Sequence, residues 1–356
     1  MSIKIVRNEQ EPRTHSNNVY FYVNGIPRLV MACVIAAEAY PDARKHLILL
    51  HQHDYRYDEI LPAISGEFES IFPLHVPTRK YSHWRQFIDV YLGPHTELQD
   101  AFEPGSDVVL FDISSPLQKF IVRHNRSLGN RVTIYAESLV VDRCFLEPDA
   151  SEWGRRIARA VFPRAYAYQH DYEVFYVLNP SIYATSPHAT KLKSLAPLYR
   201  AASFSRYARL LTAHMPLDDL EGYELVFFGQ PLSDRDKLVT RRKEQQMLAD
   251  IFAGRRTLVL PHPREILGDG DKYSALRNAT VFRSGLPNEL LLLRLRPKST
   301  ATFASTIGIA YAATNPDSAN EFYPPDERRL RMVRGNAAAL ANVRIDARFA
   351  QNNLNA

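Results

Sequence analysis

The stretch TLVLPHPRE, residues 257–265, decides how the second half of the chain is interpreted. Its apolar run LVL has the length of a short buried strand, and the run stops at a histidine that stands between two prolines. Because proline cannot donate a hydrogen bond to a sheet, we expect the strand to end at Pro261. His262 then lies at the carboxyl end of a strand, the place where open α/β sheets bind their ligands.

Strand-like and helix-like stretches alternate around this motif over most of the chain. The strand-like runs are almost continuously apolar, which is typical of parallel sheets that helices cover on both faces, so the pattern predicts an α/β fold. In the first half we expect strands at 19–24, 45–52, 68–76, 107–114 and 131–138, and helices at 25–40, 82–93 and 115–126. In the second half the alternation runs through 223–234, 236–254, 255–263, 279–295 and 299–315.

The length of 356 residues, with 46% hydrophobic and 23% charged residues, favours a globular protein with two domains. Residues 148–220 are less regular, rich in tyrosine and interrupted by prolines, so we expect helices and loops there. The predicted organisation is a Rossmann-like domain over 1–150, a helical connector over 151–220, a second Rossmann-like domain over 221–330 and a C-terminal helix or tail over 331–356.

The chain is basic, with a net charge of +5 and a pI of about 9.0. Clustered arginines suit a phosphate, an anionic saccharide, a nucleic acid or an anionic membrane surface, while a solvated helix face is the plainer alternative. The clusters from which we expect contact with an anionic membrane contain Arg155, Arg156 and Arg159 in the first case and Arg328, Arg329 and Arg331 in the second. RNA-binding signatures are absent, so we expect no nucleic-acid partner.

The expected compartment follows from the cysteines and the apolar runs. Two cysteines are too few for a disulfide scaffold, which favours a reducing environment. The first residues contain no apolar secretory segment, and the longest apolar stretch is far shorter than the ~20 residues of a membrane span. We therefore expect a cytoplasmic protein, with attachment to the inner membrane through the arginine clusters as an extension of that view.

Polar residues follow several expected strands of the second half. Gly229, His262 and the pair Ser305–Thr306 come directly after apolar runs, and in a parallel sheet such strand ends share one edge. Ser305 and Thr306 also begin an expected helix, whose first N–H groups and partial positive charge attract phosphate. Simple capping of the helix by the hydroxyls is the alternative.

Glu289 falls in the first turn of the helix expected after 285. A carboxylate there can accept hydrogen bonds from both hydroxyls of a ribose, although an acid is favourable at any helix N-terminus. The histidine, the acid and the hydroxyl pair together describe a pocket for a nucleotide phosphate.

Four stretches resemble one enzyme family. LVLPHPRE resembles the HP motif of bacterial sialyltransferases and polysialyltransferases, and FASTIG resembles their serine/threonine motif. FFGQPLSD is similar to the start of their C-terminal domain, and NNVYFYVNGIPRLVMACVIA to their first strand, loop and helix. The resemblance implies a GT-B fold with two domains facing a central cleft, a CMP-sugar donor, inversion at the anomeric carbon and no metal or other cofactor.

The resemblance also implies roles for individual residues. His262 would contact the CMP phosphate, and Pro263 would pack beside the cytidine. Ser305 and Thr306 would bind the phosphate, and Glu289 falls where such enzymes often hold the ribose. Gly229 would belong to the same donor site.

The general base is expected in the first half. The family has an acidic-acidic-glycine motif there, and this chain has Ala136, Glu137 and Ser138 in the matching stretch. Inversion requires a group that takes the proton from the acceptor hydroxyl, and Glu137 is our candidate for that base. The departure from the motif leaves Asp112 and Asp142 as alternatives.

Other signals are weaker. His51, His53 and Asp54 are residue types that bind metals, but neighbours in sequence rarely converge on one ion. The GDGDK stretch has the Asp-x-Asp pattern of metal-dependent glycosyltransferases, but its glycines are more simply explained by a turn. No Walker or nucleophile-elbow motif occurs.

Together, the resemblance and the candidate residues predict transfer of sialic acid from CMP-sialic acid to a cell-surface lipooligosaccharide or capsule glycan. Transfer of another CMP-ulosonic acid such as Kdo, use of another nucleotide sugar, and an inactive nucleotide- or glycan-binding protein are the alternatives.

Overall fold

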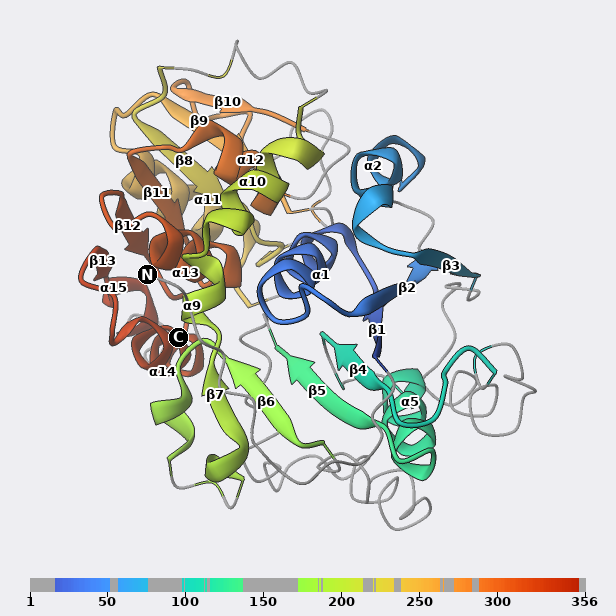
Figure 1. The fold of residues 1–356 in the computed structure, drawn as a ribbon. Coiled ribbons are helices and arrows are strands. Elements are labelled where there is room, and N and C mark those ends of the chain that lie inside the picture. The colour runs from blue at the N-terminus through green and yellow to red at the C-terminus, as the bar shows by residue number, and fades with distance from the viewer. Residues whose placement is uncertain are drawn as a thin grey trace. The chain divides into compact units, whose positions relative to one another are not determined.

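A computed structural model describes most of the chain in two compact units, Met1–Phe204 and Ser205–Ala356 (Figure 1). Both units consist of a parallel sheet with helices. The described residues are 17–51, 57–75, 98, 100–111, 113, 116–136, 172–184, 186, 188–213, 220, 222–233, 238–262, 265, 272–283 and 288–351.

The N-terminal unit contains a seven-stranded parallel sheet in the order β3-β2-β1-β4-β5-β6-β7. Its strands are β1 (Asn18–Val23), β2 (Arg44–His51), β3 (Ser70–His75), β4 (Asp107–Leu110), β5 (Arg131–Tyr135), β6 (Val174–Val177) and β7 (Leu192–Ser194). The described helices are α1 (Ile26–Glu38), α2 (Tyr57–Ile64), α5 (Pro116–Ser127) and α9 (Ala196–Tyr199), with short 3₁₀ turns at 65–67, 180–183 and 189–191. Helix α10 (Ala202–Leu211) begins in this unit and ends in the next.

The C-terminal unit contains a six-stranded parallel sheet in the order β10-β9-β8-β11-β12-β13. Its strands are β8 (Leu225–Phe228), β9 (Thr257–Leu260), β10 (Ala279–Val281), β11 (Ser299–Thr302), β12 (Ala319–Phe322) and β13 (Val343–Ile345). The described helices are α11 (Arg241–Phe252), α12 (Asn288–Leu295), α13 (Thr306–Thr314), α14 (Glu327–Ala337) and α15 (Arg348–Gln351).

The expected α/β class with two doubly wound parallel sheets is confirmed. The strands expected in both halves are present within a few residues of their predicted bounds, and β9 ends at Leu260, directly before Pro261. The helix expected at 82–93 lies outside the described residues.

Two regions differ from the expected secondary structure. β6 and β7 lie within 151–220 and extend the first sheet, where we expected only helices and loops. β13 likewise lies in the expected tail and pairs with β12. These strands have four, three and three residues, too few to show a periodicity in sequence, and hydrogen bonds to their neighbours in the sheet define them.

The central strands β8 and β9 of the C-terminal unit are buried on both faces. Leu225, Phe227 and Val259 belong to one apolar cluster, and the alternating residues Val226 and Phe228 belong to another. This explains why these strands have continuous apolar sequences. All four residues of β8 and all four of β9 are buried.

Each sheet has a point at which the strand order reverses. In the C-terminal unit the chain proceeds from β8 to β9 and β10 on one side, and to β11, β12 and β13 on the other. In the N-terminal unit the corresponding point lies between β1 and β4. Ligands of open α/β sheets bind beside such points, at the carboxyl ends of the strands.

Candidate functional site

The candidate site lies at the carboxyl edge of the C-terminal sheet. β8 pairs with β9 on one side and with β11 on the other, all parallel. Gly229 follows β8, His262 follows β9 after one proline, and Ser305 follows β11 after two residues. With neighbouring strands ~4.8 Å apart, the ends of β9 and β11 are about 10 Å from each other. The structure thus brings Gly229, His262 and the Ser305–Thr306 pair to one edge, as the sequence predicted.

The backbone before His262 is held from two directions. The Leu260 carbonyl oxygen accepts hydrogen bonds from the Gly229 N–H at 2.9 Å and from the Asn288 side-chain Nδ2 at 3.2 Å. The same Nδ2 donates to the Pro261 carbonyl oxygen at 2.9 Å. Asn288, buried at the start of α12, therefore fixes the last carbonyls before the histidine, and His262 itself is partly exposed.

Glu265 closes the turn that contains His262. Its backbone N–H donates to the His262 carbonyl oxygen at 2.9 Å. Its carboxylate accepts from the Tyr273 hydroxyl at 3.0 Å and from the Lys272 ammonium at 3.1 Å. A Cβ at Gly229 would stand 2.7 Å from both carboxylate oxygens and 2.6 Å from the Tyr273 hydroxyl, so only glycine allows this approach.

A second carboxylate shares the same ammonium. Lys272 donates to Glu244 of α11 at 2.5 Å and to the Gln230 carbonyl oxygen at 2.8 Å. Glu244 also accepts hydrogen bonds from the Ser233 hydroxyl and, at 3.0 Å, from the Ser233 N–H. The side chains of Lys272, Glu244 and Glu265 are 1%, 0% and 0% exposed. We call Glu244, Lys272, Glu265 and Tyr273 the acid–lysine cluster.

Burial dominates the electrostatics of Glu265. Burial, with a smaller contribution from the nearby Glu244, raises the pKa of this carboxyl to about 7 against the opposing effects of Lys272 and Tyr273. The charge of the cluster therefore changes near neutral pH.

Helix α13 approaches the same edge at its N-terminus. Ser305 is its N-cap, but the Ser305 side chain makes no capping hydrogen bond, so capping does not explain the residue. The Gln230 side-chain oxygen accepts from the Ala304 N–H at 2.8 Å and thereby joins the end of β8 to the segment before α13. A Cβ at Gly308 would stand 2.8 Å from the Phe322 ring, so this glycine lets the first turn of α13 pack against the sheet.

The structure places some of the other predicted residues and not the rest. Glu289 is the second residue of α12, in the first turn as expected. The predicted residues outside the described part of the chain are Pro263, Glu137, Asp112 and Asp142. The predicted roles in donor binding and catalysis thus remain predictions.

Sequence reasoning missed the residues that support the site. In the sequence Glu265 is simply the last residue of the HP motif, and the pattern around Lys272 predicts a turn. Asn288 and Glu244 lie in the first turns of α12 and α11, where such polar residues are common, so nothing in the sequence distinguishes them. The available signal was the charge of Glu265 next to a strand end, because a carboxylate there is buried only if a cation lies nearby.

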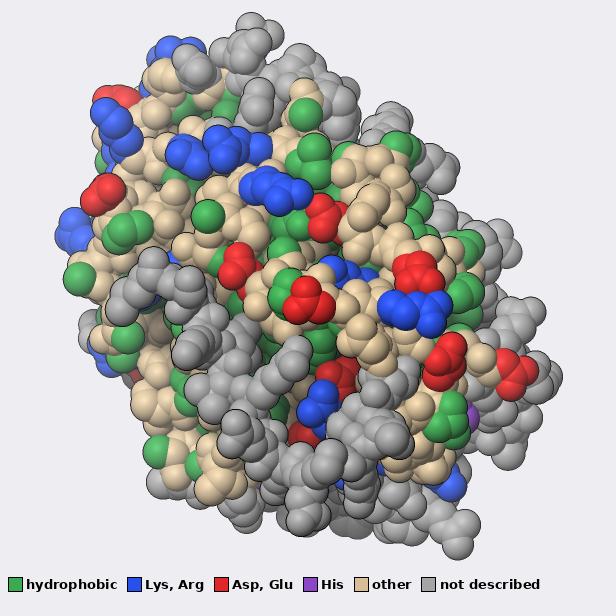
Figure 2. Space-filling view, in the orientation of Figure 1, with side chains coloured by type: hydrophobic (Ala, Val, Ile, Leu, Met, Phe, Trp, Pro, Cys, Tyr) green, Lys and Arg blue, Asp and Glu red, His purple; other side chains and the backbone are tan. Residues whose placement is uncertain are grey.

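Basic side chains are distributed over more than one surface. In the second arginine cluster, Arg328 and Arg331 are exposed, whereas Arg329 pairs with Asp326 at 2.6 Å. On the face shown in Figure 2, Lys and Arg side chains also gather around α10. The first cluster, which contains Arg155, lies outside the described residues.

The described part of the chain contains neither a metal-binding cluster nor a membrane-spanning helix. Within it, His, Cys, Asp and Glu side chains form no group of three or more that could hold a metal ion. None of the described helices is long and apolar enough to span a bilayer.

Comparison with known proteins identifies the fold. No family model and no curated protein matches the sequence. Arabidopsis thaliana UGT89C1 complexed with UDP-L-rhamnose is 11% identical with a TM-score of 0.56, covering 92% of this chain and 84% of that one. UDP-GlcNAc 2-epimerase from Neisseria meningitidis bound to UDP-GlcNAc is 11% identical with a TM-score of 0.54, covering 89% and 85%. A further UDP-N-acetylglucosamine 2-epimerase is 8% identical with a TM-score of 0.57, covering 96% and 86%.

The chain therefore has a GT-B-like fold of two Rossmann-like units, the architecture that the resemblance implied. The names of these similar proteins specify UDP-sugars and include no sialyltransferase. The narrower resemblance to sialyltransferases stays a prediction.

Proposed function

We propose that this protein is a glycosyltransferase that binds the phosphate of a nucleotide-sugar donor at the carboxyl edge of its C-terminal sheet. The observation that carries the proposal is the placement of His262 and of the N-terminus of α13 on either side of the end of β8. That placement coincides with the reversal of strand order, where open α/β sheets bind ligands. Similar structures that contain UDP-sugars support it.

The chemistry of this edge suits a leaving phosphate. Negative charge accumulates on the phosphate oxygens as the bond to the sugar breaks. The N–H groups in the first turn of α13, the hydroxyls of Ser305 and Thr306, and a donating His262 would oppose that charge. Loss of one such donor typically costs ~10²–10³ in rate. Because Asn288 and Glu265 fix the backbone on both sides of His262, the site needs little rearrangement to receive its ligand.

We further propose CMP-sialic acid as the donor and a cell-surface glycan as the acceptor. The HP and serine/threonine motifs support this choice, with Pro263 beside the base and Glu289 at the ribose. Glu137 would take the proton from the acceptor hydroxyl during inversion. CMP leaves as a phosphate monoester, whose charge the donors named above can balance without a bridging metal ion.

A UDP-sugar is the second candidate substrate. The similar structures that contain UDP-GlcNAc or UDP-L-rhamnose favour it. Some of these proteins are 2-epimerases, so a UDP-sugar could also be converted without an acceptor.

Melting and turnover measurements with several donors distinguish these possibilities. CMP-sialic acid, CMP-Kdo and UDP-GlcNAc are each added to the protein, and the true donor raises the melting temperature. Release of CMP from CMP-sialic acid, lost in His262→Ala and Glu137→Ala but retained in Thr240→Ala, supports the full proposal. Conversion of UDP-GlcNAc without an acceptor supports an epimerase. Binding without turnover indicates an inactive binding protein, and binding of none of the three contradicts the proposal.

We also propose contact with an anionic membrane through the arginine clusters. The exposure of Arg328 and Arg331 supports it. Sedimentation with vesicles containing phosphatidylglycerol should pull the protein down at low salt and release it at high salt. If an Arg328→Gln/Arg331→Gln variant sediments as much as the wild type, this cluster does not contact the membrane.

A further inference from the structure

The acid–lysine cluster is unusual because it buries two carboxyl groups around a single ammonium. Two carboxylates, Glu244 and Glu265, share the single ammonium of Lys272, and none of the three side chains is more than 1% exposed. An ion removed from water loses its hydration, and a buried ion pair rarely recovers that loss in full. Apolar residues of similar volume would serve stability as well, so the cluster calls for another explanation.

The cluster connects the His262 turn to the end of β8 by two routes. The Glu265 backbone N–H donates to the His262 carbonyl oxygen, and the Glu265 carboxylate lies against the Cα of Gly229. Lys272 reaches the same strand end through the Gln230 carbonyl oxygen. Gln230 in turn accepts from Ala304 just before α13. The cluster therefore contacts the backbone after β8 and after β9, and Gln230 connects it to the segment before α13.

We propose that Glu265, held by Lys272 and Tyr273, is a positioning residue that locks the His262 turn onto the end of β8 and so sets the affinity of the site for the nucleotide phosphate. This inference rests on the proposed function, since it needs a nucleotide at that edge. Glu265 acts through His262 and is not assigned a contact with the substrate.

The partners of Glu265 favour a rigid support. Among the described residues, Lys272 and Tyr273 bind its two carboxylate oxygens, one each, and Glu244 faces it across the ammonium. A carboxylate bound at both oxygens has one orientation, and its backbone N–H then has one position too. The raised pKa of Glu265 is a consequence of the same burial.

The first experiment measures the dissociation constants of UDP and CMP by calorimetry for the wild type and three variants. Glu265→Ala leaves Lys272 and Glu244 as a balanced pair, so we expect it to fold and to raise the dissociation constant at least tenfold. Tyr273→Phe removes a single hydrogen bond from Glu265 and should raise it about threefold, which provides a milder variant.

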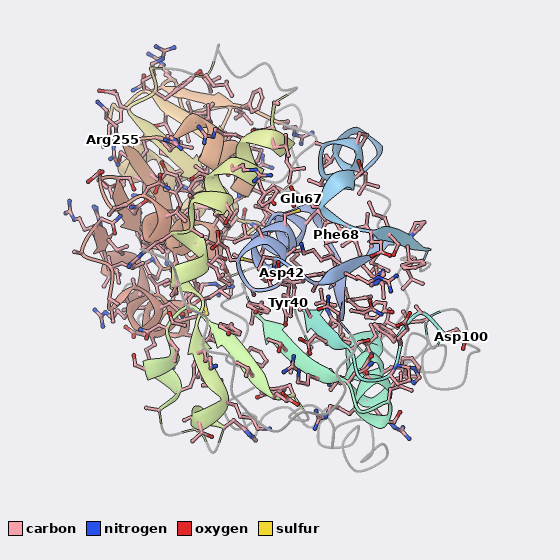
Figure 3. The ribbon with its side chains drawn as sticks, in the orientation of Figure 1. Tyr40, Asp42, Glu67, Phe68, Asp100 and Arg255 are labelled. Atoms are coloured by element: carbon pink, nitrogen blue, oxygen red, sulfur yellow. The ribbon has the colours of Figure 1, made fainter. Side chains whose placement is uncertain are left out.

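The matched control is Glu321→Ala in the same unit. Glu321 also binds a cation and a tyrosine, with Arg255 (labelled in Figure 3) at 3.1 Å and the Tyr323 hydroxyl at 2.6 Å. Arg255 lies before β9, at the amino edge of the sheet. We expect the dissociation constants of this variant to change less than twofold.

The second experiment repeats Glu265→Ala in a His262→Ala background. If Glu265 acts through His262, the tenfold effect should fall below twofold when the imidazole is absent. An effect of unchanged size in that background would show that Glu265 has a different role and would overturn the proposal.

The remaining outcomes separate this inference from the proposed function. Wild-type binding of UDP or CMP with unchanged affinity in Glu265→Ala and Tyr273→Phe overturns the inference and leaves the proposed function standing. Binding of neither nucleotide by the wild type overturns both. A loss of affinity in Glu321→Ala equal to that in Glu265→Ala would mean that general destabilisation is the cause, and it also overturns the inference.

Discussion

A neutral polar cluster in the N-terminal unit and the charged cluster in the C-terminal unit lie at opposite edges of their sheets. In the N-terminal unit Ser106 and Asn130 directly precede β4 and β5, at the amino edge. The Ser106 N–H donates to the Asn130 side-chain oxygen at 2.9 Å, and the Asn130 amide donates to the Asn125 side-chain oxygen at 2.8 Å. In the C-terminal unit the acid–lysine cluster lies at the carboxyl edge and is charged.

The difference separates support of the fold from support of a site. Neutral amides replace their hydrogen bonds to water with bonds to the backbone and to each other, so their burial costs little. Buried ions cost several kcal/mol each, so stability alone does not explain a buried ionic cluster. The charged cluster at the carboxyl edge therefore supports the site that we propose on the C-terminal unit.

The largest expected effect comes from removing the shared ammonium. Lys272→Met leaves Glu244 and Glu265 buried without a cation, and we expect the C-terminal unit to lose ~3–5 kcal/mol of unfolding free energy. Urea denaturation measures it. Arg255→Met is the control, because Arg255 is 30% exposed and water can replace it. A smaller loss in Lys272→Met than in Arg255→Met would contradict the contrast.

The next effect is a dependence of stability on pH. The pKa of Glu265 is raised to about 7, above its unfolded value of 4.5, so the folded state retains a proton that the unfolded state releases. Stability from this group is present below pH 4.5 and is lost as pH rises towards 7, which amounts to roughly 2–3 kcal/mol between pH 5 and 8.

The comparison with Glu265→Gln isolates this loss, because Gln does not titrate. Burial lowers the pKa of His46 in the N-terminal unit, so this group reduces stability as pH falls. Its effect is the same in the wild type and in Glu265→Gln. Parallel pH profiles for wild type and Glu265→Gln in urea denaturation would refute the assignment.

An intermediate effect is expected at the neutral amide network. Asn130→Ala removes the acceptor of the Ser106 N–H and the donor to Asn125, and should cost about 2 kcal/mol. The affinity for UDP or CMP should stay the same, since the network lies at the amino edge of the other sheet. Thermal unfolding measures the loss of stability, and calorimetry measures the affinity. A weakened nucleotide affinity in Asn130→Ala would contradict the placement of the site on the other sheet.

The smallest stability effect contrasts two helix starts. The Thr240 side chain caps α11 by accepting from the Lys243 N–H at 3.3 Å, whereas the Ser305 side chain caps nothing on α13. Thr240→Ala should cost about 1 kcal/mol and leave nucleotide binding unchanged. Ser305→Ala should leave stability within about 0.5 kcal/mol and weaken nucleotide binding about tenfold. The reverse pattern would make Ser305 a structural residue.

Much of the fold could be predicted because the central strands of both sheets are buried on both faces. β1 and β8 are apolar at nearly every position, and Pro261 marks the end of β9 in sequence. The short strands β7 and β13 could not be found in this way, since the hydrogen bonds of their neighbours define them.

Only part of the candidate site could be predicted from the sequence. His262 and Ser305 stand next to strand ends, so parallel pairing alone brings them to one edge. Glu265 and Lys272 support the site because they are buried against each other. Asn288 supports it because its side chain binds two backbone carbonyls. No sequence pattern reports such contacts between separate elements.

Amide hydrogen exchange with and without CMP-sialic acid or UDP-GlcNAc tests the central claim most directly. We expect a bound nucleotide sugar to slow exchange at the N-terminus of α13, residues 306–308, and at His262. Exchange at the amide network of Ser106 and Asn130 should not change. Slower exchange confined to the N-terminal unit, with residues 306–308 and His262 unaffected by a ligand that binds, would contradict the account.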